Sequence, residues 1–195
     1  MQQNNAPAVE QTLAGRKIAI LVSSGFNELE MTDPQRALLA AGAQVKIVSR
    51  DNGLVNGWHE NSWGHFFPID ADLAQALAVD YDGLLIPGGP RGVAKLRQDA
   101  HARRFVRAFL RGNQPVVAIG EGAGVLIEGG IEGRQVTSAA EVKVELEAAG
   151  ARWSEAAIVT DGALVTAQST ADRAELIAAM IAAFGAYRPE VNQAA

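Results

Sequence analysis

Four short apolar runs alternate along the chain with segments of helical pattern. The runs are residues 18–22, 45–48, 84–86 and 116–119. Between them, segments such as 36–41 and 100–111 carry apolar residues three and four positions apart, which indicates helix. Strands that are apolar almost throughout are covered on both faces. The pattern therefore predicts an α/β fold with a mostly parallel sheet and helices on each side.

A different pattern closes the chain. Residues 158–160 and 164–166 flank Asp161-Gly162, a strong signal for a β-hairpin. A final helix is expected over about residues 171–184, with Leu176, Met180 and Ile181 on one face. The predicted sheet therefore ends in an antiparallel element.

One sizeable core is expected, because 195 residues with 48% hydrophobic content suit a single domain. We assign that domain to residues 16–186, with a disordered N-terminal tail at 1–15 and a C-terminal tail at 187–195. Residues 1–15 have neither the basic start nor the apolar run of a signal peptide. No apolar stretch approaches the roughly 18 to 20 residues that cross a bilayer. We expect a soluble, cytoplasmic protein with no membrane partner.

Charge and residue content exclude several function classes. The net charge of −5, without any Lys/Arg run, argues against nucleic acid as a partner. The chain has no cysteine, so a disulfide, a thiolate nucleophile and a Cys-ligated metal are impossible. His59, His65 and His101 show no coordinating spacing with acidic residues, so no metal site is expected. We expect no cofactor.

The start of the first helix is open to two interpretations. Asp33-Pro34 has the form of an N-cap followed by a first helical residue, which predicts a helix over residues 34–41. The alternative helix begins near Glu28 and tolerates a kink at Pro34.

Three loops follow the predicted strands, at the edge of an open parallel sheet where ligands bind. They comprise residues 23–28, 87–90 and 120–124, and each is rich in small residues that let the backbone approach a ligand. The glycines of 120–124 also suggest a dinucleotide-binding loop. Their spacing is not G-x-G-x-x-G, however, and Glu121 would repel a phosphate.

At these loops the chain resembles the ThiJ/PfpI superfamily. The match extends from about residue 17 to 184. Five motifs carry it: Leu85-Ile86-Pro87-Gly88-Gly89 before a short helix, residues 117–119 running into a tight turn, and residues 133–138, 149–153 and 159–166. The resemblance implies a flavodoxin-like three-layer sandwich with a mostly parallel sheet and a C-terminal β-hairpin. It also implies a homodimer or a higher homo-oligomer.

This chain differs from the family that it resembles at the positions of the family's catalytic residues. Members of that family carry a reactive cysteine on a strained elbow, a histidine next to it, and a glutamate from the first loop that hydrogen-bonds the thiol. Here these positions fall on Gly120, Glu121 and Asn27. The family's activities include peptidase-like, glyoxalase, deglycase and chaperone functions. Since glycine cannot attack a carbonyl, we predict a pseudoenzyme that keeps the elbow and binds an unknown small molecule or partner.

A rival interpretation is a hydrolase or lyase acting on a carbonyl compound. Glu121 would be its general acid/base, with a pKa raised by an apolar elbow; the alternative is a carboxylate stabilised by a helix dipole. Asn27 and Glu28, with Glu30, offer a neighbouring polar group, although Glu28 or Glu30 as a surface residue is the simpler explanation.

The backbone of the same loops supplies the predicted binding residues. The resemblance implies that the amides of Gly88 and Gly89 form an oxyanion hole. The alternative is that these two residues belong to an ordinary tight turn. Gly120 and Gly122 complete the predicted binding set.

A third function class is an oligomeric stress or interaction protein, for which any pocket is incidental. A polar-aromatic cluster outside these loops has three separate explanations. It lines a pocket mouth, forms a subunit contact, or is a loop packed on its own aromatic rings. Its members are Trp58, His59, Trp63 and His65.

Overall fold

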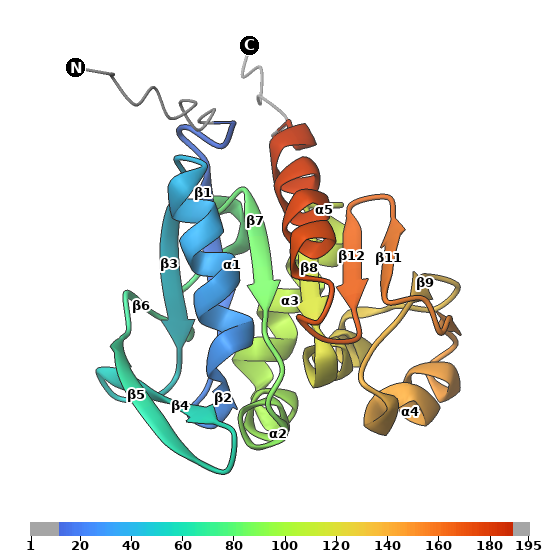
Figure 1. The fold of residues 1–195 in the computed structure, drawn as a ribbon, viewed down its shortest axis with the longest axis horizontal. Helices are drawn as coiled ribbons and strands as arrows, with labels where there is room; N and C mark the ends of the chain where they lie inside the picture. Colours follow the sequence, from blue (N-terminus) through green and yellow to red (C-terminus); the bar gives the residue numbers. More distant parts are fainter. Residues whose placement is uncertain (1–11, 189–195) are drawn as a thin grey trace, which may run out of the picture.

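A seven-stranded sheet forms the middle layer of the molecule, for which a computed structural model describes residues 12–188 (Figure 1). In spatial order its strands are β11 (Ile158–Asp161), β12 (Leu164–Ala167), β8 (Val116–Ile119), β7 (Gly83–Ile86), β1 (Lys17–Leu21), β3 (Gln44–Ser49) and β6 (Ala71–Asp72). All neighbouring strands are parallel except β11 and β12. The predicted strands and the C-terminal hairpin are confirmed.

Helices cover both faces of this sheet. They are α1 (Glu28–Ala40), α2 (Pro90–Gln98), α3 (Ala100–Arg111), α4 (Lys143–Ala148) and α5 (Arg173–Ala186), with 3₁₀ helices η1 (Ala78–Asp80), η2 (Gly120–Gly129) and η3 (Ala140–Val142). Helices α1 and α5 lie on one face, and α2 and α3 lie on the other (Figure 1). The three-layer, flavodoxin-like sandwich is confirmed.

Side chains of β1 alternate between the two cores. Ile18 and Ile20 pack in the cluster that includes Phe184 of α5, whereas Ala19 and Leu21 pack in the cluster that includes Phe105 of α3. Because successive side chains of a strand point to opposite faces, an apolar strand is buried on both sides. Because β1, β7 and β8 pair in parallel, their carboxyl ends lie together at one end of the sheet.

Two small sheets accompany the main one. Strand β2 (Phe26–Asn27) pairs with β4 (Leu54–His59), which forms a hairpin with β5 (Ser62–Pro68), and β9 (Gln135–Val136) pairs with β10 (Arg152–Trp153). The segment that sequence analysis treated as a loop with Trp58 and His65 is therefore a β-hairpin. Trp58 and Trp63 stack edge to face within it, with ring centroids 5.3 Å apart.

The first helix follows the earlier of its two predicted starts. It begins at Glu28 and continues through Pro34 to Ala40, so the start at Pro34 is wrong. Asn27 caps the helix, because its Oδ1 accepts a hydrogen bond from the amide of Glu30 at 3.4 Å. Pro34 has no amide for the carbonyl four residues earlier, yet it is accommodated as a buried residue inside the helix.

The predicted N-terminal tail is too long. Leu13 is fully buried, and its amide donates to the carbonyl of Ala41, so packed structure begins before Gly15. Residues 1–11 of that tail, and residues 189–195 of the C-terminal tail, lie outside the described residues. Within residues 12–188, no helix is long and apolar enough to cross a membrane.

Candidate functional site at the strand ends

The loop after β7 docks on the start of α1 through a single glycine. The amide of Asn27 donates to the carbonyl of Gly88 at 2.8 Å, and the amide of Gly88 donates to Glu30 Oε2, also at 2.8 Å. In a capping box, the side chain of the glutamate at this position accepts a hydrogen bond from the amide of the capping residue. Here Glu30 and the amide of Asn27 each bond to Gly88 instead, which joins two segments that lie 58 positions apart.

Glu30 is a buried acid. The residue is 6% exposed although it occupies the first turn of a helix, which corrects the expectation of a surface residue. Burial raises the pKa of Glu30 to about 7; the charge of Glu121 adds to this effect and the hydrogen bond from Gly88 opposes it. Glu30 can therefore exchange a proton near neutral pH.

Gly120 forms the elbow between β8 and η2. Its φ of +58° lies in the left-handed region, where a side chain is strained. A Cβ built on Gly120 would stand 3.2 Å from Glu30 Oε2 and 3.3 Å from Oε1. The residue that faces the elbow is therefore Glu30 and not Asn27, which is engaged in capping α1.

Glu121 completes the cluster from the other side. Its Oε2 accepts a hydrogen bond from the amide of Gly89 at 3.0 Å. Glu121 Oε2 and Glu30 Oε2 each lie 2.5 Å from the position that a Cβ of Gly88 would occupy, so the oxygens are at most twice that distance apart. The amides predicted as an oxyanion hole are thus both bonded to carboxylates of the chain itself.

The remaining predicted residues have structural roles. Glu28 Oε2 accepts from the amide of His65 at 2.8 Å, and Glu28 Oε1 contacts His65 Nδ1, so this carboxylate ties the β4–β5 hairpin to α1. Burial opposes the ionisation of Glu28, but the hydrogen bonds from His65 outweigh it and lower the pKa of Glu28. Gly122 packs closely against the end of β7, since a Cβ there would stand 2.5 Å from the carbonyl of Ile86.

Hydroxyl groups of the first loop are also committed to structure. Asp51 accepts hydrogen bonds from Ser23 Oγ at 2.8 Å and from the amide of Ser24 at 2.8 Å, and the Ser24 hydroxyl bonds to it as well. These contacts fasten the loop after β1 to the loop after β3. Within residues 12–188, no group of three or more potential ligands is placed to hold a metal ion.

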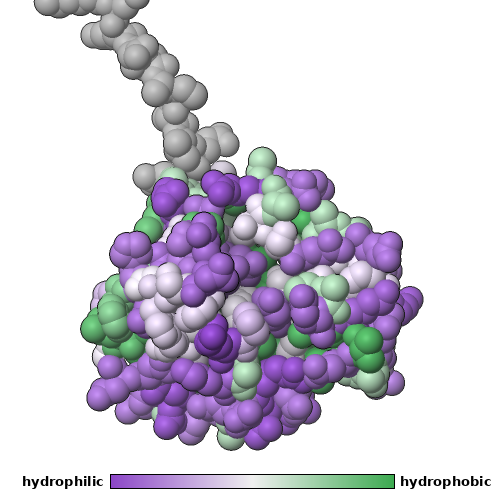
Figure 2. Space-filling model, turned by 60° about the horizontal axis from the view of Figure 1, so that its bottom comes forward, coloured by the Kyte–Doolittle hydropathy of each residue, from purple (hydrophilic) through white to green (hydrophobic). Residues whose placement is uncertain are grey.

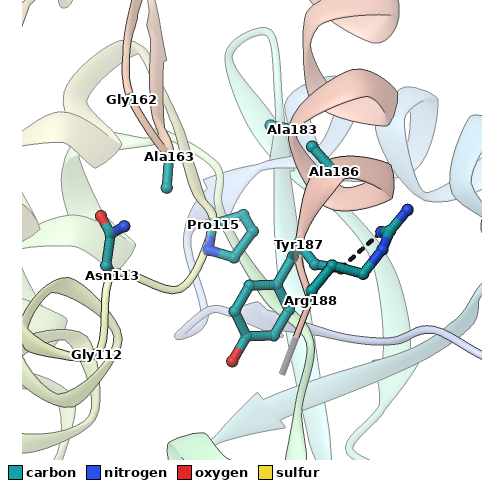
Figure 3. A pocket seen from close by; sticks show the side chains of 9 residues that line it. All are labelled: Gly112, Asn113, Pro115, Gly162, Ala163, Ala183, Ala186, Tyr187 and Arg188. Atoms are coloured by element: carbon teal, nitrogen blue, oxygen red, sulfur yellow. Dashed lines mark hydrogen bonds between the residues drawn. The ribbon is translucent and has the colours of Figure 1, made fainter. Parts of the chain in front are cut away.

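A separate pocket of about 470 Å³ lies at the opposite end of β8 and β12 (Figure 3). The side chains of Asn113 and Tyr187 line it together with small apolar residues. None of the predicted site residues contributes to this pocket. The chemistry predicted from the sequence therefore belongs to the strand ends, and the far pocket is a distinct feature.

Family membership follows from both sequence and fold. The profile described as the DJ-1/PfpI family matches residues 16–183. The chain belongs to the DJ-1/PfpI family. An uncharacterized protein of Staphylococcus haemolyticus is 35% identical over 161 residues, covering 80% of this chain and 91% of that protein. A Bacillus subtilis protein named "Putative cysteine protease YraA" is 34% identical over 159 residues, covering 80% and 91%.

Solved structures agree on the architecture. The chain superimposes with a TM-score of 0.80 and 29% identity on a two-domain protein of Anabaena variabilis that contains DJ-1/ThiJ/PfpI-like and ferritin-like domains. That match covers 92% of this chain and 52% of the other. A ThiJ/PfpI domain protein of Brachyspira murdochii gives a TM-score of 0.80 at 20% identity, covering 90% of this chain and 99% of the other. The second likeness shows the fold alone.

Sequence reasoning missed Glu30 as the acid at the elbow. The available signal was local, because Asn27-Glu28-Leu29-Glu30 fits the spacing of a capping box. That signal places Glu30 in the first helical turn but does not indicate which distant amide it meets. The contact with Gly88 exists only once β1 and β7 pair as neighbours.

Proposed function

We propose that this chain is a non-thiol member of the DJ-1/PfpI family that binds a small molecule or a partner without the covalent catalysis of cysteine-bearing members. One observation carries the proposal: Gly120 offers no nucleophile, and the adjacent amides of Gly88 and Gly89 are bonded to Glu30 and Glu121. Acyl or carbonyl addition needs both an attacking group and free donors for the developing oxyanion. A site without either is suited to binding.

The surface around the strand ends is consistent with a polar ligand. Figure 2 turns this end toward the viewer, and hydrophilic residues cover most of it, with hydrophobic residues in small separate groups. We infer that a ligand at this end is recognised through hydrogen bonds and charge.

Turnover of methylglyoxal by the purified protein tests the loss of thiol chemistry. The expected result is no turnover, with or without prior treatment with iodoacetamide. Turnover that iodoacetamide abolishes would contradict the proposal.

A thermal-shift screen of polar metabolites tests the binding function. Each compound that stabilises the protein is measured again with Glu121→Ala and with Ala183→Trp, which fills the far pocket. For a ligand that binds at the strand ends, the shift in melting temperature should differ from the wild type in Glu121→Ala but not in Ala183→Trp. A set of compounds that responds only to Ala183→Trp would move the binding function to the far pocket.

A second candidate is an acid/base enzyme acting on a carbonyl compound. The observation in its favour is the pairing of Glu121 with Glu30, whose pKa of about 7 suits proton transfer at neutral pH. This activity would resist iodoacetamide and would be lost in both Glu30→Gln and Glu121→Gln. Loss in only one variant would argue against a paired mechanism.

We also propose a homodimer that uses the β4–β5 hairpin. Strand β5 is the edge of its small sheet, and Trp63 and Phe66 on it are 52% and 66% exposed. Exposed apolar edge strands are prone to pairing. Sedimentation equilibrium at micromolar concentration should give twice the chain mass, and Phe66→Glu should lower it. A wild-type mass near 20.5 kDa would rule out the dimer. An interaction role would use this same hairpin.

A further inference from the structure

Two consecutive amides of one loop converge on a single small region. Those of Gly88 and Gly89 donate to Glu30 and Glu121 at 2.8 and 3.0 Å, and both accepting oxygens lie 2.5 Å from one point beside Gly88. Successive backbone amides arranged in this way form a concavity that binds anions. In this chain both amides bind carboxylates of the chain itself.

The two carboxylates are held with different firmness. Glu30 is almost completely buried, and its helix is fixed to the same loop through the amide of Asn27. Glu121 is half-buried, and within residues 12–188 its side chain makes one hydrogen bond, to Gly89. Departure of Glu121 would cost one hydrogen bond and would expose the amide of Gly89. Glu121 is thus the occupant that an outside group can replace.

The charge that acts on the pKa of Glu30 is that of Glu121, and it raises this pKa. On its own helix, the next turn carries Asp33, which is paired with Arg36 and with Arg173 of α5. From η2 the charged group facing Glu30 is Glu121, and on the hairpin side Glu28 is bonded to His65.

Those surroundings determine what Glu30 offers to an anion. Burial raises the pKa of Glu30 to about 7, and the charge of Glu121 adds to this effect. In its neutral form Glu30 still accepts from Gly88 and gains an O–H that can donate.

We propose that the amide of Gly89 and the carboxyl group of Glu30 form a binding site for a small carboxylate, and that Glu121 is a tethered carboxylate occupying it. The inference rests on the proposed binding function and names its ligand class. A carboxylate compound displaces Glu121, accepts from Gly89 N–H with one oxygen and accepts from the Glu30 O–H with the other. No covalent step is involved.

Acetate is the probe, compared with chloride at equal ionic strength. In Glu121→Ala the site is empty, so acetate should raise the melting temperature and give a saturation-transfer NMR signal. Binding requires the proton on Glu30, so acetate affinity should fall as the pH rises through the pKa of Glu30, which burial keeps above its usual value. In Glu121→Ala/Glu30→Gln, where the amide replaces the acid as donor, acetate should still bind and the pH dependence should disappear.

Controls separate this site from unspecific effects. Glu147→Ala removes an exposed glutamate of α4, and like the wild type, in which Glu121 competes for the site, it should respond to acetate more weakly than Glu121→Ala. If Glu121→Ala does not fold, Glu121→Ser empties the same site with a smaller change in polarity. Equal effects of acetate and chloride on the folded variant would overturn the inference, as would an equal acetate response in Glu147→Ala. Neutral metabolites that bind the strand ends, without any acetate response, would overturn the carboxylate class and leave the binding function standing.

Discussion

Glu30 and Glu121 accept hydrogen bonds from adjacent amides of one loop, although they come from opposite sides of the elbow. Glu30 belongs to the first turn of α1, and Glu121 follows Gly120 at the end of β8. The loop after β7 is placed between them because β7 lies between β1 and β8 in the sheet. The order of the strands thus brings two acids together that are far apart in sequence.

Replacing Gly120 by alanine should destabilise the fold by about 1 to 3 kcal/mol. The added Cβ is strained at a φ of +58° and stands 3.2 Å from the carboxylate of Glu30. Urea melts measure the change in the free energy of unfolding. Gly162→Ala is the matched control, because Gly162 has a φ of +60° and open space around it. Gly120→Ala should cost more than the control; a neutral or stabilising effect would show that the elbow is unstrained.

Local patterns predicted much of this fold. The helix over residues 100–111 was foreseen to the residue, because its apolar positions repeat at helical spacing and Gly112 follows it. The hairpin around Asp161-Gly162 was foreseen because a tight turn has a strong short-range signal. The start of α1 was harder to predict, since the local capping preference of Asp33-Pro34 competes with that of Asn27. Burial of Pro34 and Leu38 in the packed structure favours the longer helix.

The candidate site could be predicted only in part. Gly88, Gly89, Gly120 and Glu121 were identified because they follow apolar strands, and the ends of parallel strands share one edge. The partners of Glu28 and Glu30 were not predictable from spacing. These residues are two positions apart on one helical turn, yet one carboxylate meets His65 and the other meets Gly88. Which partner each side chain reaches depends on the path of the hairpin and on the order of the strands.

Stability should fall as the pH rises from about 4.5 to 7 through the ionisation of Glu30. In the unfolded chain this group loses its proton near 4.5, whereas the folded protein keeps it up to about 7. The folded state therefore binds more protons in this window, and up to about 3 kcal/mol of stability is lost across it. Glu30→Gln should gain stability relative to the wild type by a similar amount between pH 4.5 and pH 8. Urea melts at both pH values measure this difference, and Glu147→Gln should show none.

Replacing Gly64 by alanine should detach the hairpin from α1. A Cβ on Gly64 would stand 1.9 Å from Glu28 Oε2, so the carboxylate must move and lose its hydrogen bonds to His65. The expected cost is about 1 to 3 kcal/mol in the free energy of unfolding. A double-mutant cycle isolates the cause: in a Glu28→Ala background the same substitution should cost little. Equal costs in the two backgrounds would mean that Gly64 is needed for another reason.

Introducing a cysteine at the elbow should not by itself recreate a reactive thiol. In Gly120→Cys the sulfur is attached to a Cβ that lies 3.2 Å from Glu30 Oε2, with Glu121 close by. Neighbouring negative charges disfavour the thiolate, so the thiol pKa should lie above its usual value of about 8.5. Alkylation by iodoacetamide at pH 7.5 should therefore be slower than that of N-acetylcysteine. The wild-type chain has no cysteine, so every label reports this one site.

Gly120→Cys/Glu121→His removes one negative charge and frees the amide of Gly89, and should react about tenfold faster than the single variant. Circular dichroism confirms that both variants fold before the rates are compared. Rapid alkylation of the single variant would show that the two carboxylates do not hold negative charge beside the elbow at this pH.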